Sequence, residues 1–281
     1  MTHRAHRVLL GITTSVIAAV LMLPAVTASA DPMETAKPLA HPEQDYAGVQ
    51  IRKYESPPST NVDAHAVMAQ AKDQQTLGND VSSFQSKVDW PTMSHGGGKF
   101  SYIKATEGVN YTNPYFDQQS GGSHQAGLWH GAYHFALPDV SNGIVQANFF
   151  VDHGGKWVRD GKTLPPALDM EYNPYGDVCY KLSATDMVNW VKAFSDQVHK
   201  RTGRYPMIYT SLSWWTKCTG NNASLGKTNP LWVARYNKDI GTLPNGWAKQ
   251  TIWQFADKGP FPGDQNVLNG PITALTTLAN G

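Results

Sequence analysis

The sequence carries little charge and almost no surplus of either sign. Only 16% of its 281 residues are charged, and 23 Lys and Arg against 22 Asp and Glu give a formal net charge of +1. A nucleic-acid-binding protein normally carries a basic surplus, so we expect no nucleic-acid partner. With 41% hydrophobic residues, 9 Trp and 12 Tyr, the chain is also unlike a long disordered protein. The composition predicts a globular protein with a sizeable core.

Several common catalytic and cofactor-binding motifs are absent. The sequence has no G-x-S-x-G, H-E-x-x-H, P-loop or G-x-G-x-x-G motif. His130 and His134 are four residues apart, but the residues between them are typical of a strand, so a structural role is favoured over metal binding. We therefore predict neither a metal site nor a cofactor.

The first thirty residues have the pattern of a signal peptide. Arg4 and Arg7 precede an apolar run from residue 8 to about residue 26, and Ala28-Ser29-Ala30 offers small residues for cleavage. An uncleaved membrane anchor is the alternative, but the A-x-A end and the polar sequence after it favour cleavage. No second apolar run approaches the ~20 residues needed to span a bilayer. We expect a secreted, extracellular protein that is free of the membrane after cleavage, and a monomer.

Only two cysteines are present, Cys179 and Cys218, and neither belongs to a C-x-x-C motif. In an exported protein such a pair is normally bridged, since the compartment is oxidising. A catalytic thiol or a metal site is the weaker interpretation. The sequence therefore predicts a disulfide that closes a loop of about 40 residues.

Residues 31–76 differ in composition from the rest of the chain. They contain five prolines and few large apolar residues, and an Ala- and Gln-rich stretch within residues 61–75 is compatible with a short helix. We interpret residues 31–76 as an N-terminal extension or pro-segment outside the core. The domain that carries the function should then comprise residues 77–281.

From residue 77 onward, apolar strand-like runs alternate with helical stretches or loops. The clearest helix begins at Ser183, with Asp186 as a capping partner, and ends at Gly203. Strand spacings of about 25 to 40 residues are typical of βαβ units, which predicts an α/β fold with a largely parallel sheet, closed as a single irregular (β/α) barrel of the TIM type. Pro- and Gly-rich connections predict less regularity at the C-terminal end, and closure needs one strand more than the seven that are visible. The predicted strands are residues 79–84, 100–105, 129–136, 166–171, 206–211, 231–236 and 251–255.

An apolar strand near the middle of the chain ends in two carboxylates, Asp169 and Glu171. Side chains two residues apart point to the same face of a strand, so both acids should face one space. In a barrel, the C-terminal end of a strand carries the active site. Paired carboxylates, one with a pKa raised by the other, are the usual apparatus for hydrolysing a glycosidic bond. A buried ion pair or a solvated strand end is the alternative interpretation.

Two further acids and four aromatic residues extend this candidate site. Asp80 lies in the first predicted strand and Asp264 follows the last, and these strands are neighbours in a closed barrel. Aromatic rings are platforms for sugar rings, although the same residues could be ordinary core aromatics. The candidate substrate-binding aromatics are Tyr133, Phe135, Tyr209 and Trp232.

Five groups of residues follow one another along the chain: NDVSSFQ (79–85) with VDW (88–90), YIKATEG (102–108), GAYHF (131–135), LDME (168–171) and IWQF (252–255). In this order they resemble the motifs of the family 25 glycoside hydrolases, which are muramidases or lysozymes. The resemblance covers about residues 77 to 275 and leaves residues 31–76 unmatched.

The resemblance implies hydrolysis of the β-1,4 bond between N-acetylmuramic acid and N-acetylglucosamine, with peptidoglycan glycan strands as the partner. It also implies that Glu171 is the proton donor, and that Asp169, Asp80 and Asp264 are the other acids of the site. The division of roles among the three Asp residues stays open. The substrate's own acetamido oxygen can attack with Asp169 orienting the amide, or Asp80 can attack or activate water.

Two other functions compete with this interpretation. A family 18-like chitinase or endo-N-acetylglucosaminidase also uses a strand-end D-x-E, but its longer D-x-x-D-x-D-x-E motif needs Asp where this chain has Leu164 and Ala167. A non-catalytic glycan-binding protein on the same barrel is the second alternative. The presence of all four acids argues against it.

Overall fold

The computed structural model describes residues 1–2, 38–55, 62–71 and 74–281. The predicted signal peptide, residues 1–30, lies almost entirely outside these ranges and stays a prediction. Within them, no helix is both long and apolar enough to cross a membrane. The residues described from Pro38 onward belong to one compact unit.

Eight strands form a closed barrel, because β1 pairs with β2 on one side and with β9 on the other. A two-residue strand, β3 (Tyr111–Thr112), adds a short hairpin to β2. The fold class predicted from the sequence is confirmed. The barrel strands are β1 (Thr76–Val81), β2 (Phe100–Glu107), β4 (Trp129–Phe135), β5 (Ala167–Asp169), β6 (Met207–Thr210), β7 (Leu231–Ala234), β8 (Ile252–Ala256) and β9 (Asp264–Leu268).

Strand β9 is the closing strand that the sequence did not reveal, and it runs antiparallel to both β1 and β8. The other barrel pairs are parallel. The sequence of β9, DQNVL, begins with three polar residues and therefore lacks the apolar pattern of a buried strand. The connection from β7 to β8 contains no helix, as expected for the less regular C-terminal end.

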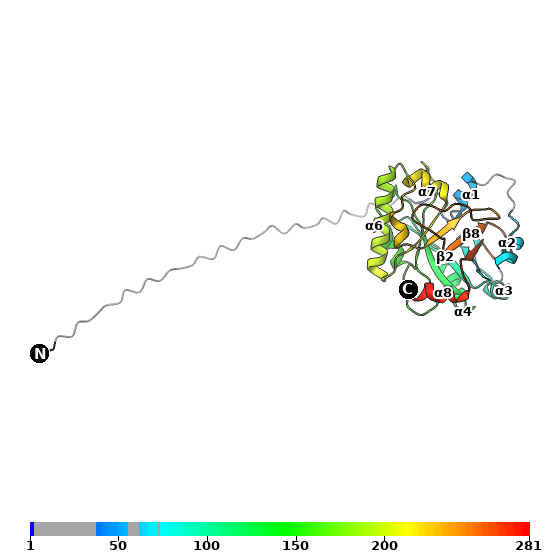
Figure 1. The fold of residues 1–281 in the computed structure, drawn as a ribbon, viewed down its shortest axis with the longest axis horizontal. Helices are drawn as coiled ribbons and strands as arrows, with labels where there is room; N and C mark the ends of the chain where they lie inside the picture. The colour runs from blue at the N-terminus through cyan, green and yellow to red at the C-terminus, as the bar shows by residue number, and fades with distance from the viewer. Residues whose placement is uncertain (3–37, 56–61, 72–73) are drawn as a thin grey trace. The chain divides into compact units, whose positions relative to one another are not determined.

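Helices surround the barrel (Figure 1). The longest, α6 (Ala184–Thr202), begins where the sequence predicted: the Ser183 side chain accepts a hydrogen bond from the Asp186 N–H, and Gly203 ends the helix with φ 76°. Its apolar face packs on α5, and Met187, Val191 and Phe194 are buried there. The other helices of the barrel domain are α3 (Trp90–His95), α4 (Phe116–Gln125), α5 (Gly143–Asp152), α7 (Leu212–Thr219) and α8 (Ile272–Asn280).

Part of the N-terminal stretch belongs to the core. Helices α1 (Val49–Glu55) and α2 (Ala64–Ala71) precede the barrel, and α2 confirms the short Ala- and Gln-rich helix. Ala47 and Ile51 are 0% and 1% exposed and pack in the hydrophobic core. The expectation that residues 31–76 lie outside the core is therefore wrong for these residues. The N-terminal stretch contains few large apolar residues, so its composition gave no sign that some of them are buried.

Candidate active site

Asp169 and Glu171 lie together at the C-terminal end of β5, as the i, i+2 spacing predicted. Asp169 is the last residue of β5, and both carboxyls are 0% exposed. The chain stays extended beyond the strand because the Met170 N–H donates to the Tyr209 carbonyl at 2.9 Å. The charge of Glu171 is one of the causes that raise the pKa of Asp169.

Asp80 and Asp264 join this pair through the closure of the barrel. They are direct partners in the antiparallel ladder of β1 and β9. Both are buried, with 2% and 3% exposure. Burial raises the pKa of Asp80 to about 7, while hydrogen bonds from Gln254 and Asn266 favour its ionised form. Burial, followed by the charge of Asp80, raises the pKa of Asp264 well above its ordinary value.

Glu171 accepts three main-chain hydrogen bonds from the segment before α2. The Gly48 N–H lies 2.7 Å from Oε1, and the N–H groups of Gln50 and Ile51 each lie 2.9 Å from Oε2. Burial raises the pKa of Glu171 to about 8 in spite of these bonds, which favour the carboxylate. The main cause is therefore burial, and the charge of Asp169, which the sequence suggested, is not the leading one.

Asp169 is equally buried but differs from Glu171 in its hydrogen bonds. Neither of its carboxyl oxygens has a hydrogen-bond partner in the described part of the chain. Burial, followed by the charge of Glu171, raises its pKa well above the ordinary value. The negative charge of Glu171 therefore disfavours ionisation of the Asp169 carboxyl.

The sequence analysis did not identify three polar residues of the site, which are Gln254, Asn266 and Tyr236. The side-chain amides of Gln254 and Asn266 donate to Asp80 Oδ2 at 2.9 and 2.6 Å, and the Tyr236 hydroxyl donates to Gln254 Oε1 at 2.8 Å. The i, i+2 rule that linked Asp169 to Glu171 also places Asn266 on the same face as Asp264. Buried polar residues on barrel strands were thus a usable signal.

The four predicted sugar-binding aromatics are all 0% exposed. The hydroxyl of Tyr133 accepts from the Ala47 N–H at 3.2 Å, and that of Tyr209 donates to Gln254 Oε1 at 2.7 Å, so both reach the acidic site. Trp232 packs against Tyr133 and Tyr209 inside the barrel, and its indole N–H donates to Asn266 at 2.8 Å. The ring of Phe135 lies 5.2 Å from the Lys104 ammonium. Their role in binding sugar stays a prediction.

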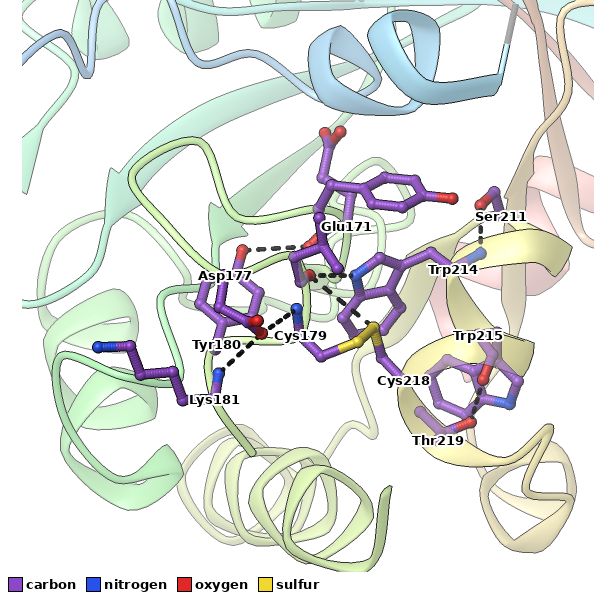
Figure 2. Close-up of a disulfide and its surroundings, with 12 residues drawn as sticks. Glu171, Asp177, Cys179, Tyr180, Lys181, Ser211, Trp214, Trp215, Cys218 and Thr219 are labelled. Carbon is purple, nitrogen blue, oxygen red and sulfur yellow. Dashed lines mark hydrogen bonds between the residues drawn. A yellow bond between two sulfur atoms is a disulfide. The ribbon is translucent and has the colours of Figure 1, made fainter. Parts of the chain in front are cut away.

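The predicted disulfide between Cys179 and Cys218 is present, with the Cα atoms 5.3 Å apart (Figure 2). It ties the loop after β5 to helix α7, which contains Cys218. The same loop holds Tyr180, whose hydroxyl donates to the main-chain carbonyl of Glu171 at 3.1 Å. The bridge therefore fixes the chain that follows the D-x-E pair.

No group of three or more His, Cys, Asp or Glu in the described ranges could hold a metal ion. His134 contacts Thr106 at 2.7 Å and Gln146 at 2.9 Å, which is a structural role. A closed α/β barrel with a D-x-E pair at a strand end and further acids on adjoining strands defines the class: the site is that of a glycoside hydrolase.

Comparisons with known proteins place the chain within that class. Residues 79–264 match the family model of glycosyl hydrolases family 25. An N,O-diacetylmuramidase from Chalaropsis sp. is 48% identical over 208 residues, which are 73% of this chain and 99% of that protein. Lysozyme M1 from Streptomyces globisporus is 41% identical over 208 residues, covering 72% and 71% of the two chains. The solved structure of a family GH25 lysozyme from Aspergillus fumigatus has 45% identity and a TM-score of 0.73, covering 74% of this chain and 100% of that one. The chain belongs to glycosyl hydrolase family 25.

Proposed function

We propose that the protein is a secreted lysozyme that hydrolyses the β-1,4 bond between N-acetylmuramic acid and N-acetylglucosamine in bacterial peptidoglycan. The observation that carries the proposal is the placement of Glu171 and Asp169 at the end of β5, beside Asp80 and Asp264, with the pKa of each carboxyl raised. Relatives named as a muramidase and a lysozyme share this family and support the same substrate.

Glu171 is the proton donor of the proposed mechanism. Because its pKa is raised, the carboxyl keeps a proton that it can deliver to the glycosidic oxygen as the C1–O bond breaks. The acetamido oxygen of the substrate then attacks C1, while Asp169, whose oxygens accept no hydrogen bond from the described residues, accepts the amide N–H. Water subsequently opens this intermediate, with the Glu171 carboxylate taking its proton, and the configuration at C1 is retained. Asp80 as nucleophile or base for water is the competing assignment.

Product analysis tests the bond that is cut. Purified peptidoglycan is digested with the secreted protein in excess chelator, and the products are reduced with borohydride. Reduced N-acetylmuramic acid at the new ends supports the proposal, whereas reduced N-acetylglucosamine would indicate a glucosaminidase. Activity that is lost in chelator and restored by a divalent ion would contradict the metal-free mechanism. An NMR time course of the first anomer released from a soluble oligosaccharide tests retention.

A further inference from the structure

Residues 41–55, here called the covering segment, lie against Glu171 and Gln254 of the candidate site, and they precede the residues that match the family. We propose that the covering segment is an autoinhibitory element, which blocks the active site until it is displaced or cut away. This inference rests on the proposed function, because it assumes that Glu171 must reach a glycosidic oxygen.

The covering segment occupies both oxygens of Glu171. A proton donor must come within about 2.6–3.2 Å of the oxygen that it protonates. In the structure, Oε1 and Oε2 instead accept three main-chain N–H groups at 2.7 to 2.9 Å, and the carboxyl is fully buried. A glycosidic oxygen cannot reach Glu171 while these bonds persist. The described structure is therefore a closed form of the enzyme.

Gly48 is the residue that enters the site most closely. A Cβ atom at this position would lie 2.6 Å from Gln254 Oε1 and 2.7 Å from the Tyr209 hydroxyl, and would collide with the Tyr236 hydroxyl. Its φ of +99° also suits glycine alone. The neighbouring carbonyl of Ala47 accepts from the Gln254 amide at 3.0 Å, and this amide also holds Asp80. The covering segment thus uses the polar groups around the acids as its own partners.

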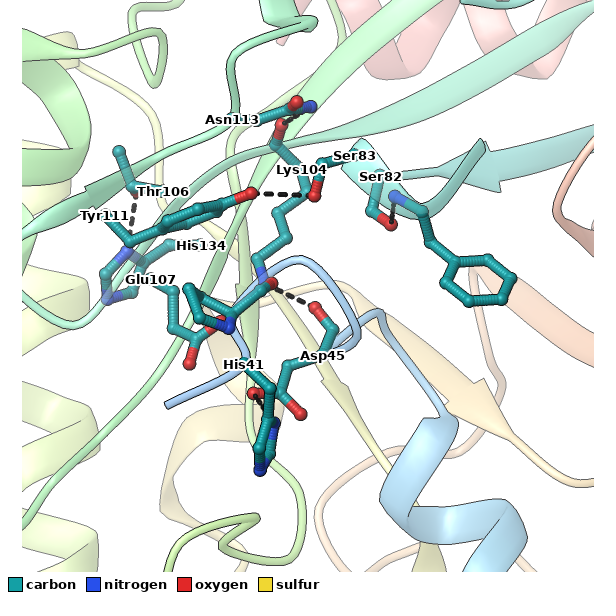
Figure 3. A network of polar contacts seen from close by, with 12 residues as sticks. His41, Asp45, Ser82, Ser83, Lys104, Thr106, Glu107, Tyr111, Asn113 and His134 are labelled. Carbon is teal, nitrogen blue, oxygen red and sulfur yellow. Dashed lines mark hydrogen bonds and ion pairs between the residues drawn. The ribbon is translucent and has the colours of Figure 1, made fainter. Parts of the chain in front are cut away.

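Side chains anchor the covering segment on both sides of Gly48. Before it, Asp45 is buried beside the Lys104–Glu107 ion pair (Figure 3). The Tyr175 hydroxyl contacts the carboxylates of Asp45 and Glu107 at 2.5 and 2.8 Å. The Lys104 ammonium donates to main-chain carbonyls of the covering segment, including that of Pro42 at 2.9 Å.

After Gly48, helix α1 is fixed to the rim of the barrel. Arg52 pairs with Asp257 at 2.5 Å. Glu55 accepts hydrogen bonds from the hydroxyls of Tyr172, at 2.9 Å, and Ser211. A cleft along α1 is lined by Tyr54, Tyr172, Tyr236 and other residues, but none of the four acids lines it. Substrate in this cleft would therefore lie outside the acidic site.

A substitution at Gly48 tests the inference in the full-length secreted chain. Gly48→Val should expel the covering segment and raise the rate of wall lysis roughly 10-fold or more, since a dominant closed state leaves about 0.1–10% of the protein open. Gly97→Val is the matched control. Gly97 has the same φ of +99°, but a Cβ there meets nothing within 4 Å, so the lysis rate should not change.

Two further tests do not depend on how the Gly48→Val chain folds. Arg52→Glu should raise lysis roughly two- to fivefold by opposing Asp257, whereas the same charge change at the exposed Lys53 should not. A sequence-specific protease site inserted between Glu55 and Val62 allows the covering segment to be cut in otherwise intact protein. Cutting followed by dilution should give the same rise as Gly48→Val.

The outcomes separate this inference from the proposed function. Equal lysis by the uncut chain, the cut chain and the Gly48→Val chain would overturn autoinhibition and leave the muramidase assignment standing. Folded protein that is inactive in all three forms, as judged by a cooperative melting transition, would overturn the assignment itself. Lysis that appears only after cutting or with Gly48→Val supports both.

Discussion

Asp169 and Glu171 project from the same end of β5, yet Glu171 accepts three main-chain hydrogen bonds while Asp169 accepts none in the described part of the chain. Burial raises the pKa of both carboxyls. The difference therefore lies in their partners: Glu171 is held by the covering segment, whereas Asp169 is left with unused acceptor capacity. This difference fits the proposed roles. Glu171 must be uncovered before it can donate its proton, and Asp169 has oxygens that can accept an amide N–H from the substrate.

Replacement of the proton donor should abolish most of the activity. General acid catalysis contributes roughly 10²–10⁴-fold, so Glu171→Gln should slow lysis by about that factor, measured on the cut chain by turbidity of bacterial walls. Asp196→Asn, which removes an exposed acid on α6, is the control and should retain the full rate. A folded Glu171→Gln protein with near wild-type lysis would remove Glu171 from this role.

The pH dependence of the cut enzyme should follow the proton of Glu171. A general acid acts only when protonated, so activity should be lost as pH rises through the pKa of Glu171. In the covered form, burial raises that pKa from its ordinary value of 4.5 to about 8. Asp169→Asn removes a nearby negative charge and should move the descending limb to lower pH. A profile that rises across this range would contradict the assignment of Glu171 as the acid.

The features that could be predicted from the sequence are those with a side-chain pattern. The apolar run that ends in Asp169 and Glu171, and the capped helix between Ser183 and Gly203, show such patterns. Strand β9 does not, because its buried side chains, such as Asp264 and Asn266, are polar groups of the site. Because the first and last strands of a closed barrel are neighbours, we could still predict that Asp80 and Asp264 lie close together, and they are partners in the ladder of β1 and β9.

The contact between the covering segment and Glu171 was beyond sequence reasoning for a different reason. It is made by main-chain N–H groups, which every residue except proline carries, so no residue pattern marks it. The one contribution from a side chain is its absence: Gly48 has no Cβ atom, and a Cβ atom would not fit at this position. A single glycine among 25 is not distinguishable by sequence alone.

The disulfide should contribute measurably to stability. A bridge with a sequence separation of 39 residues is worth about 4 kcal/mol in the chain-entropy model. In a domain of this size, Cys179→Ser combined with Cys218→Ser should lower the Tm by roughly 10 °C, as measured by calorimetry. Mass spectrometry of the wild-type protein, with and without reductant, checks that the bridge forms. Two free thiols in secreted protein, or an unchanged Tm in the double variant, would contradict the prediction.

Inhibition by the covering segment should weaken as pH rises. Burial raises the pKa of Asp45 in the docked segment, although Tyr175, Lys104 and His41 favour its ionised form. Glu107 also faces it, with a pKa raised to about 7 by burial. An undocked Asp45 regains its ordinary pKa, so docking takes up protons. The contribution of Asp45 to docking is complete below its ordinary pKa of 3.8 and is lost as pH rises through its raised pKa in the docked form.

The ratio of lysis rates between cut and uncut enzyme isolates this effect, because the catalytic pH dependence is common to both forms to a first approximation. The ratio should fall as pH is raised above about 4, since the closed form loses stability as Asp45 ionises. Asp45→Asn removes this titrating group and should make the fall shallower. A ratio that stays constant with pH in the wild-type chain, or one that rises, would show that Asp45 does not control docking.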